Sequence, residues 1–273
     1  MNAVRPPLAA GRFYPADAGE LARVVDGLLE QAQPAAPSGV LRGLVAPHAG
    51  YVYSGRVAAT AFAAVREQVE QLRVALLGPA HFTPLRRTAV SGADAWRTPL
   101  GEVPVDRELR AAAVAAGAVV DDRPHRDDHA LEVELPFLQR RVGRGLRVLP
   151  IAVGSGVDET AAVVAALGPD ALIVISTDLS HDHDDETARR LDRRTAEAVV
   201  SLDADAIGDL DACGAHALRG AVLHARRSKW RCSLLDLRTS ADAGGDEASV
   251  VGYGAFAFYA GTPVGERQTS PAS

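Results

Sequence analysis

Three histidines in this 273-residue chain stand just after short apolar runs that read as buried strands. His48 follows "LVAP", His81 follows "LLGPA", and His181 follows "LIVISTDLS". Ligands of open α/β sheets bind beyond the carboxyl ends of the strands. Proline and glycine beside the first two histidines favour tight turns that aim a side chain inward. We therefore expect the three loops to meet at one edge of a sheet and to face a shared cleft.

Carboxylates stand at comparable places. Asp178 follows the same strand as His181, and Asp242 follows an apolar run that ends near Arg238. Two histidines and a carboxylate suit a non-haem Fe(II) site with open positions, and they also suit a catalytic Zn²⁺ that holds water. Asp178 could equally cap a following helix. The residue types alone leave these alternatives open.

Other catalytic signatures are absent from the sequence. It contains no phosphate-binding G-x-x-x-x-G-K-[ST] loop, no G-x-S-x-G nucleophile elbow and no H-E-x-x-H zinc motif. Ser180 and His181 are adjacent, and neighbouring side chains rarely face one another, so a serine triad is poorly supported.

The remaining histidines and one cysteine have less informative surroundings. His125 lies in the charged loop "DDRPHRDDH" and is expected to be exposed, whereas the spacing of His129, at the end of that loop, does not decide between surface and site. His216 and His224 fall on a predicted helix and are expected to be structural. Cys213, beside a glycine, is expected to pack, with a role in lining the site as the alternative.

Strand-like and helix-like segments alternate along most of the chain, which predicts one α/β domain over residues 1–262 with a parallel or mixed sheet covered by helices on both faces. Asp17 is expected to cap the first helix, and Pro136 predicts a kink or a late start in the helical segment 130–142. The polar tail 263–273 is expected to be disordered. The predicted strands are 40–46, 73–77, 85–91, 146–153, 171–176, 232–238 and 250–259, and the predicted helices are 17–33, 54–70, 107–116, 130–142, 158–167, 184–200 and 213–227.

Composition limits the classes of partner. A formal net charge of -6 without a Lys/Arg cluster argues against nucleic acid. No apolar run approaches the roughly 18 residues that a membrane helix needs, and the first 15 residues lack a signal-peptide core. Two cysteines without C-x-x-C spacing favour a reducing compartment. We expect a cytoplasmic protein, of bacterial source judging by its content of Ala, Arg and Val.

Six motifs, "RPPLAAGRFYP", "APHAGYVYSG", "LLGPAHF", "DDHALEVELPFLQ", "STDLSH" and "SVVGYGAFAF", together resemble the MEMO (mediator of cell motility) family from about Arg5 to Tyr259. Prokaryotic members are described as protein B of an "AmmeMemoRadiSam" gene set, which implies a functional link to a radical-SAM protein. The family is similar in structure to class III extradiol dioxygenases, which hold Fe(II) with two histidines and a glutamate. The resemblance therefore implies a single-domain αβα sandwich with a non-haem metal site.

The resemblance also assigns roles to individual residues. It implies His48 and His81 as metal ligands and His181 as the acid/base histidine. His129 is similar to a further active-site histidine, and Asp178 to a polar residue that lines the pocket. The late loop "TSADAGGDEAS" lacks the cysteine that some members carry. The nearest carboxylate there, Asp242, is the expected third ligand, with Asp246 and Glu247 as the alternatives.

Three functions follow from these residues. The first is a metal-dependent oxidoreductase, dioxygenase-like, acting on an unknown small molecule with Fe(II), or with Cu or Zn in its place. The second is a non-catalytic protein that uses the same cleft to bind a metal, a peptide or a small molecule. Eukaryotic members are associated with phosphotyrosine peptides and with iron or copper handling, but the histidine loops carry few Arg or Lys residues for a phosphate. The third is a zinc hydrolase, disfavoured because no Glu adjoins a histidine.

Overall fold

The computed structural model describes residues 3–33, 39–66, 71–154 and 156–261. The tail expected to be disordered, 263–273, lies outside these residues. The described strands are β1 (Val4–Arg5), β2 (Val40–Ala46), β3 (Leu72–Gly78), β4 (Ala89–Val90), β5 (Ala95–Thr98), β6 (Gly101–Pro104), β7 (Val119–Val120), β8 (Leu146–Ala152), β9 (Ala171–Ser176), β10 (His181–His183), β11 (Arg231–Thr239) and β12 (Val250–Ala260). The α-helices are α1 (Ala18–Gln31), α2 (Tyr51–Ala63), α3 (Arg107–Ala115), α4 (Arg123–Arg126), α5 (Leu135–Val142), α6 (Val157–Ala166), α7 (Asp185–Val200) and α8 (Ala215–Arg227), and the 3-10 helices are η1 (Gly143–Gly145), η2 (Ala204–Ala206) and η3 (Ser240–Ala243).

The central sheet has the strand order β10-β12-β2-β9-β3-β8-β4-β7, with β11 also paired to β12. Strands β2, β9, β3 and β8 are parallel neighbours, whereas β12 is antiparallel to β2. The predicted mixed sheet is thus confirmed. Val45 of β2 and Leu77 of β3 both pair in register with Ile175 of β9, which lies between them. A second, three-stranded sheet has the order β1-β5-β6.

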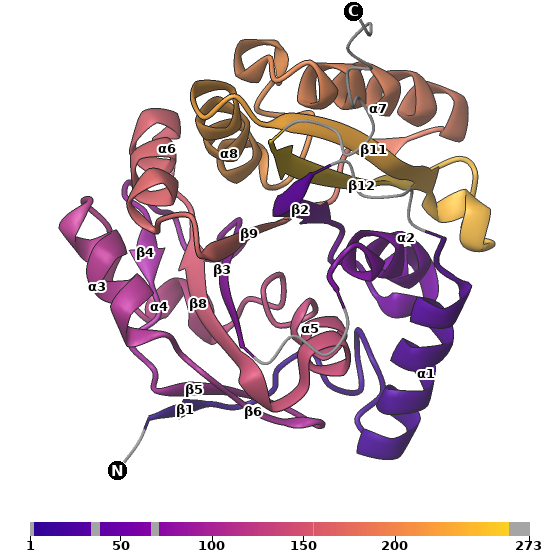
Figure 1. Ribbon diagram of the computed structural model, residues 1–273. Helices are drawn as coiled ribbons and strands as arrows, with labels where there is room; N and C mark the ends of the chain where they lie inside the picture. The colour runs from indigo at the N-terminus through magenta and orange to yellow at the C-terminus, as the bar shows by residue number, and fades with distance from the viewer. Residues whose placement is uncertain (1–2, 34–38, 67–70, 155, 262–273) are drawn as a thin grey trace, which may run out of the picture.

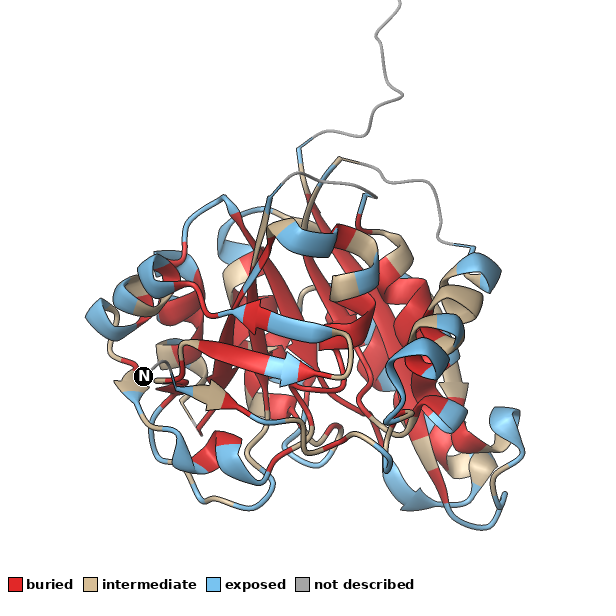
Figure 2. Ribbon diagram, turned by 90° about the horizontal axis from the view of Figure 1, so that it is seen from below, coloured by how far each residue is buried: buried red, intermediate tan, exposed pale blue. Residues whose placement is uncertain are grey.

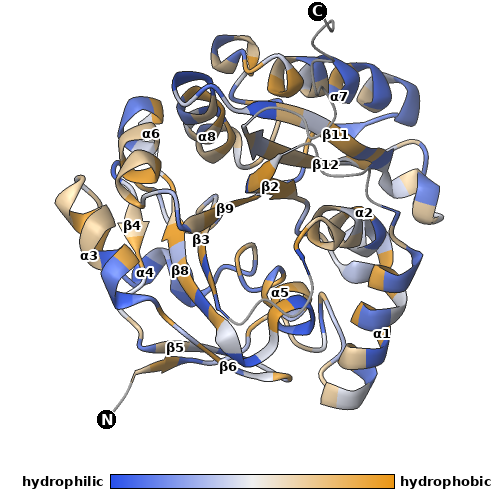
Figure 3. Cartoon of the chain, viewed as in Figure 1, coloured by the Kyte–Doolittle hydropathy of each residue, from blue (hydrophilic) through white to orange (hydrophobic). Residues whose placement is uncertain are grey.

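Helices cover both faces of the central sheet (Figure 1). Helices α1, α2 and α5 pack together on one side, and α3, α6 and α8 on the other, while α7 packs on β11 and β12. All six residues of β9 are buried, as expected for a parallel strand covered twice. Burial is concentrated in the central strands and the inner helix faces (Figure 2), and the apolar residues follow the same pattern (Figure 3). This arrangement is the predicted αβα sandwich.

Local signals explain several element ends. The Asp17 side chain accepts a hydrogen bond from Glu20 N and caps α1, as predicted. Helix α5 begins only at Leu135, with Pro136 in its first turn, so the late start is confirmed.

Other element bounds were predicted less well. The strand expected over 85–91 shrinks to the two residues of β4, and the hairpin of β5 and β6 was not predicted. The helix expected over 54–70 begins three residues earlier and ends at Ala63, and residues 67–70 lie outside the described ones. Across the described residues, no helix is both long and apolar enough to cross a bilayer.

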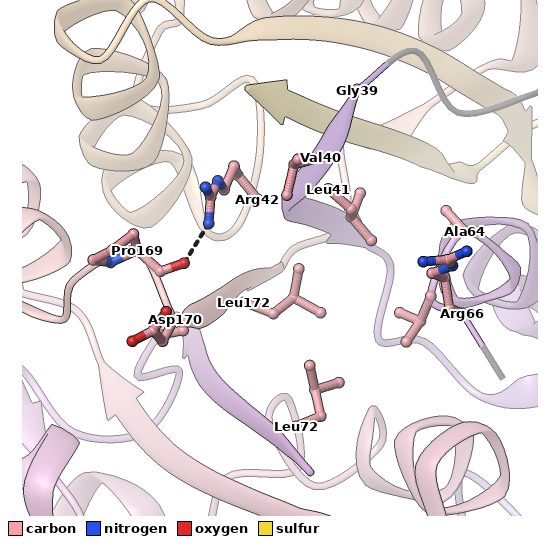
Figure 4. Close-up of a pocket in the computed structure, with 12 residues that line it drawn as sticks. Gly39, Val40, Leu41, Arg42, Ala64, Arg66, Leu72, Pro169, Asp170 and Leu172 are labelled. Carbon is pink, nitrogen blue, oxygen red and sulfur yellow. Dashed lines mark hydrogen bonds between the residues drawn. The ribbon is translucent and has the colours of Figure 1, made fainter. Parts of the chain in front are cut away.

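The amino ends of β2 and β9 border an apolar pocket of about 600 Å³ (Figure 4). Val40, Leu72 and Leu172 line it, and the Arg42 guanidinium donates to the Pro169 carbonyl at its side. This pocket lies at the end of the strands opposite to the histidine loops, and the described residues that line it include no histidine.

Candidate metal centre

The strand order brings the three histidine loops together. Because β9 lies between β2 and β3 and all three are parallel, the loops that follow them open at the same end of the sheet. His48 follows β2, His81 follows β3, and Asp178 and His181 follow β9. A further histidine, His129, reaches the same end from the segment that precedes α5.

His48, His81 and His129 form a compact cluster in which one ring nitrogen of each lies within 4.8 Å of the others. Their ring centroids are 5.3 to 5.6 Å apart, and the rings of His81 and His129 are stacked. Phe13 also stacks on the His129 ring, with 3.9 Å between the ring centroids. His48 is 2% exposed, whereas the side chains of His81 and His129 are 26% and 18% exposed. The cluster therefore opens to solvent on the side of the last two.

Hydrogen bonds hold His48 on every side. Its backbone N–H donates to Asp178 Oδ1 at 2.8 Å, its Nδ1 lies 2.9 Å from Ser176 Oγ, and its Nε2 lies 3.3 Å from Cys213 Sγ. Cys213 thus contacts a cluster histidine instead of only packing, which is the alternative that the sequence left open.

Asp128 orients His81, a role that the sequence did not reveal. Its carboxylate accepts from the His81 backbone N–H at 2.6 Å and from the Ala130 N–H at 3.0 Å, and Oδ1 lies 3.1 Å from His81 Nδ1. A carboxylate can only accept here, so His81 Nδ1 carries the proton and Nε2 keeps its lone pair. This is the carboxylate–histidine arrangement that commonly supports a metal-bound imidazole.

The pKa values favour uncharged rings at two of the three positions. Burial, followed by the neighbouring imidazole of His81, lowers the pKa of His48 to about 3. Burial and the nearby His48 lower the pKa of His129 to about 4. Burial also acts to lower the pKa of His81, but the hydrogen bond and the charge of Asp128 outweigh it and raise this pKa. Neutral imidazoles have the lone pairs that a metal ion requires.

Asp178 and His181 lie beside the cluster. Asp178 is 5% exposed, and burial raises the pKa of its carboxyl, opposed by the N–H groups of His48 and Ala49 and by the charge of His181. His181 is exposed, and its Nδ1 lies 2.8 Å from the Leu179 carbonyl oxygen. Since a carbonyl only accepts, Nδ1 is the donor, and His181 Nε2 is the nitrogen available for proton exchange.

Asp242 lies outside the cluster. Its carboxylate accepts from Thr239 N at 2.9 Å, as part of a capping box, and pairs with Arg189 at 3.0 Å. The physical reason is the strand order, because β11 is separated from β2 by β12 and adjacent strands are about 4.8 Å apart. The two alternative carboxylates, Asp246 and Glu247, are exposed in the same late loop.

A buried network that sequence reasoning missed ties the N-terminal segment to the site. Glu132, fully buried, accepts from Arg5 Nη1 at 2.5 Å and from the backbone N–H groups of Leu8 and Ala9 at 2.8 Å, and it also accepts from the Tyr14 hydroxyl. Arg5 further donates to the carbonyls of His125 and Asp128. A glutamate inside the apolar run "ALEVELP" was the available signal.

His125 corrects one expectation. It is 2% exposed, not exposed as predicted, because its short helix α4 tucks the ring edge-on against Trp96 at 5.6 Å. Burial lowers its pKa to about 4, and Nε2 finds no hydrogen-bond partner among the described residues. His216 and His224 lie on a helix, α8, as expected, and neither belongs to the cluster, although His216 lines a pocket together with Ala80 and Cys213.

Comparisons with known proteins agree with this architecture. The family model described as Memo-like protein matches residues 5–257. A MEMO1 family protein of Methanopyrus kandleri is 32% identical, over 94% of this chain and 99% of its own, and one of Archaeoglobus fulgidus is 35% identical, over 93% and 99%. An uncharacterized protein of Escherichia coli K12 shares the fold, with a TM-score of 0.52 at 11% identity over 81% of this chain and 100% of its own. These relatives do not decide whether the source is bacterial, so that expectation stays a prediction. They do show the family, and the chain belongs to the Memo-like proteins.

Proposed function

We propose that this protein binds one transition-metal ion, Fe(II) in the first instance, at His48, His81 and His129, and uses it for redox chemistry on a small molecule. The observation that carries the proposal is the convergence of three ring nitrogens within 4.8 Å at the carboxyl end of the sheet. Imidazole nitrogens are suited to iron, copper and zinc, and a site with three protein ligands leaves positions open for other molecules.

The surrounding residues support a metal site more than a plain packing cluster. Asp128 holds His81 with Nε2 free, and Ser176 contacts the Nδ1 of His48. Such outer contacts orient metal-bound imidazoles and raise their basicity. Among the residues that the structure describes, the nearest carboxylate oxygen to the His129 ring, on Asp128, is 4.0 Å away, so His129 has no comparably short partner there. Phe13 stacks on its ring instead and sets its plane.

Iron(II), when bound, would supply the electron transfer that protein side chains cannot. His181 would move a proton to or from a substrate oxygen through Nε2, since Nδ1 is held by the Leu179 carbonyl. Asp178 fixes the His48 backbone and is buried next to the cluster, so it would orient the site on the His181 side.

A second candidate function is metal handling without catalysis. The observation that favours it is the Cys213 thiol, whose sulfur lies 3.3 Å from His48 Nε2. Sulfur is a soft ligand that favours Cu(I) and zinc over the harder ions. A protein that passes copper or zinc onward would need such a ligand more than it would need His181.

Anaerobic reconstitution with Fe(II), followed by oxygen uptake with a panel of catechols, tests the proposal. We expect one equivalent of iron in the wild type and its loss in His48→Ala and His81→Ala. His224→Ala is the matched control, because this histidine lies on α8 edge-on against Trp230 and outside the cluster. Failure of the wild type to bind iron, copper or zinc would refute the metal site. Binding without oxygen uptake would favour metal handling over the oxidoreductase.

A further inference from the structure

The hydroxyl of Ser176, the last residue of β9, is the centre of a buried hydrogen-bond cluster. Its Oγ lies 2.9 Å from His48 Nδ1, 2.8 Å from the Ala130 carbonyl oxygen and 2.8 Å from Glu134 Oε1. Ser176, Ala130 and Glu134 have no exposed surface, and His48 has almost none. Bulk solvent does not reach such a cluster, so the directions of its hydrogen bonds follow from the donors and acceptors that the protein groups offer one another.

Counting protons assigns a direction to each of these hydrogen bonds. A serine hydroxyl has one proton to donate and two lone pairs that accept. The Ala130 carbonyl can only accept, so it takes the Ser176 proton. Both remaining neighbours must then donate to Ser176 Oγ, which requires a proton on His48 Nδ1 and a proton on Glu134 Oε1.

The surroundings of Glu134 agree with a protonated carboxyl. Among the described residues no cation pairs with it, and its second oxygen, Oε2, has no hydrogen-bond partner. An isolated carboxylate in such a place is strongly disfavoured, whereas the neutral acid costs much less. Burial accordingly raises the pKa of Glu134 well above its ordinary value.

We propose that Ser176, held by Glu134 in its acid form, is a positioning residue that keeps His48 in the Nδ1–H tautomer and so leaves the lone pair on Nε2. The opposite side of the ring agrees with this direction. The Asp178 backbone N–H donates to Cys213 Sγ at 3.3 Å. Among the acceptors near the Cys213 S–H, His48 Nε2 at 3.3 Å is closer than Thr177 Oγ1 at 3.6 Å and the Asp178 carbonyl oxygen at 3.7 Å. With the S–H directed at His48 Nε2, the hydrogen bonds from Asp178 N to the Ala130 carbonyl run one way, and Nε2 is the ring nitrogen that keeps a lone pair for a ligand.

Nitrogen-15 NMR of the histidine rings in the metal-free protein tests the tautomer directly. We expect His48 to carry its proton on Nδ1 in the wild type. In Ser176→Ala the acceptor at Nδ1 is lost, so we expect a shift to the Nε2–H form, which can donate to Cys213. A wild-type Nε2–H tautomer, or an unchanged Nδ1–H tautomer in Ser176→Ala, would overturn the proposal. If Ser176→Ala does not fold, the wild-type spectrum still tests the tautomer, because an Nδ1–H signal supports the proposal and an Nε2–H signal overturns it.

Infrared difference spectroscopy tests the acid form of Glu134. The wild type minus Glu134→Gln spectrum at pH 7 should contain the carbonyl stretch of an un-ionised carboxylic acid. Glu132→Gln is the matched control, because that glutamate is equally buried but paired with Arg5, and its difference spectrum should contain a carboxylate band instead. A carboxylate band in the Glu134→Gln difference would contradict the assignment.

The assignment of the His48 tautomer does not depend on a bound metal. Its role in ligand binding, however, rests on the proposed metal site. In a metal titration, Ser176→Ala should bind about 10- to 100-fold more weakly than the wild type, the usual effect of losing such an outer contact. If the wild type binds no metal, the proposed function fails, while the NMR and infrared results stand. If it binds metal but His48 shows the other tautomer, the role of Ser176 fails alone.

Discussion

Replacing Arg5 with methionine removes the cation that pairs with the buried Glu132. The side chains of the pair are 7% and 0% exposed, so solvent screens their interaction little. Breaking a buried ion pair by removing one partner costs about 3–5 kcal/mol, because the remaining charge has no compensation. Methionine keeps much of the apolar stem but loses the hydrogen bonds to the His125 and Asp128 carbonyls and the contact over the Trp96 ring at 4.1 Å. We therefore expect the free energy of unfolding to fall by about 4 kcal/mol, which lowers the melting temperature by about 10 °C.

Urea unfolding followed by circular dichroism measures this loss. The matched control is Arg140→Met, since Arg140 pairs with Asp26 at the surface, where the side chains are 40% and 38% exposed. Such a pair contributes about 0–1 kcal/mol. If Arg5→Met costs no more than Arg140→Met, the view that the Arg5–Glu132 network anchors the N-terminal segment to the site is refuted.

Three further predictions concern pH, packing and the metal. Burial lowers the folded-state pKa of His125 to about 4, so the unfolded chain takes up a proton first as pH falls. Between pH 6.5 and 4 the wild type should therefore lose about 3 kcal/mol of stability that His125→Phe keeps. Unfolding measured at pH 7.5 and 4.5 tests this, and the same loss of stability in both proteins would contradict it. A Cβ at Gly252 would lie 1.9 Å from Asp192 Oδ2, so Gly252→Ala should destabilise the fold by about 1–3 kcal/mol. Gly27 lies in helix α1 and a Cβ there would have nothing within 4 Å, so Gly27→Ala should stabilise the fold by about 0.5–1 kcal/mol. Equal effects of the two substitutions in urea unfolding would show that the close approach at Gly252 is unimportant. Metal at 100 times its dissociation constant should add about 2.7 kcal/mol of stability to the wild type, and a chelator should remove it. Neither metal nor chelator should change the stability of His48→Ala, and calorimetric melting with and without chelator checks both expectations.

Much of the fold follows from local patterns that the sequence displays. The continuous apolar runs of β2, β3, β8 and β9 indicate buried parallel strands, and Pro136 predicts the late start of α5. The strand β4 and the hairpin of β5 and β6 are too short to be recognised by periodicity. Short strands of this kind form because they pair with neighbouring strands in the folded protein. Their presence therefore depends on tertiary contacts and not on the local sequence pattern.

The residues of the candidate site likewise fall into those that local patterns predict and those that depend on the tertiary fold. His48, His81 and His181 could be placed because each follows a recognisable strand. Asp242 was expected beside them for the same reason, but which strands are neighbours depends on the order of the sheet, and β12 lies between β11 and β2. Only the resemblance favoured His129, because its approach to the site depends on the loop that Arg5 holds through the Asp128 carbonyl.

A Co(II) titration of two variants tests most directly whether His48, His81 and His129 make the metal site. The visible absorption of bound Co(II) reports the ligands, and each variant removes one candidate for the third position. We predict that Asp242→Asn binds one equivalent as the wild type does, because its carboxylate is held by Thr239 and Arg189. His129→Ala should bind at least about 100-fold more weakly, since losing a ligand costs more than losing an outer contact. Loss of binding in Asp242→Asn with binding retained in His129→Ala would contradict the account.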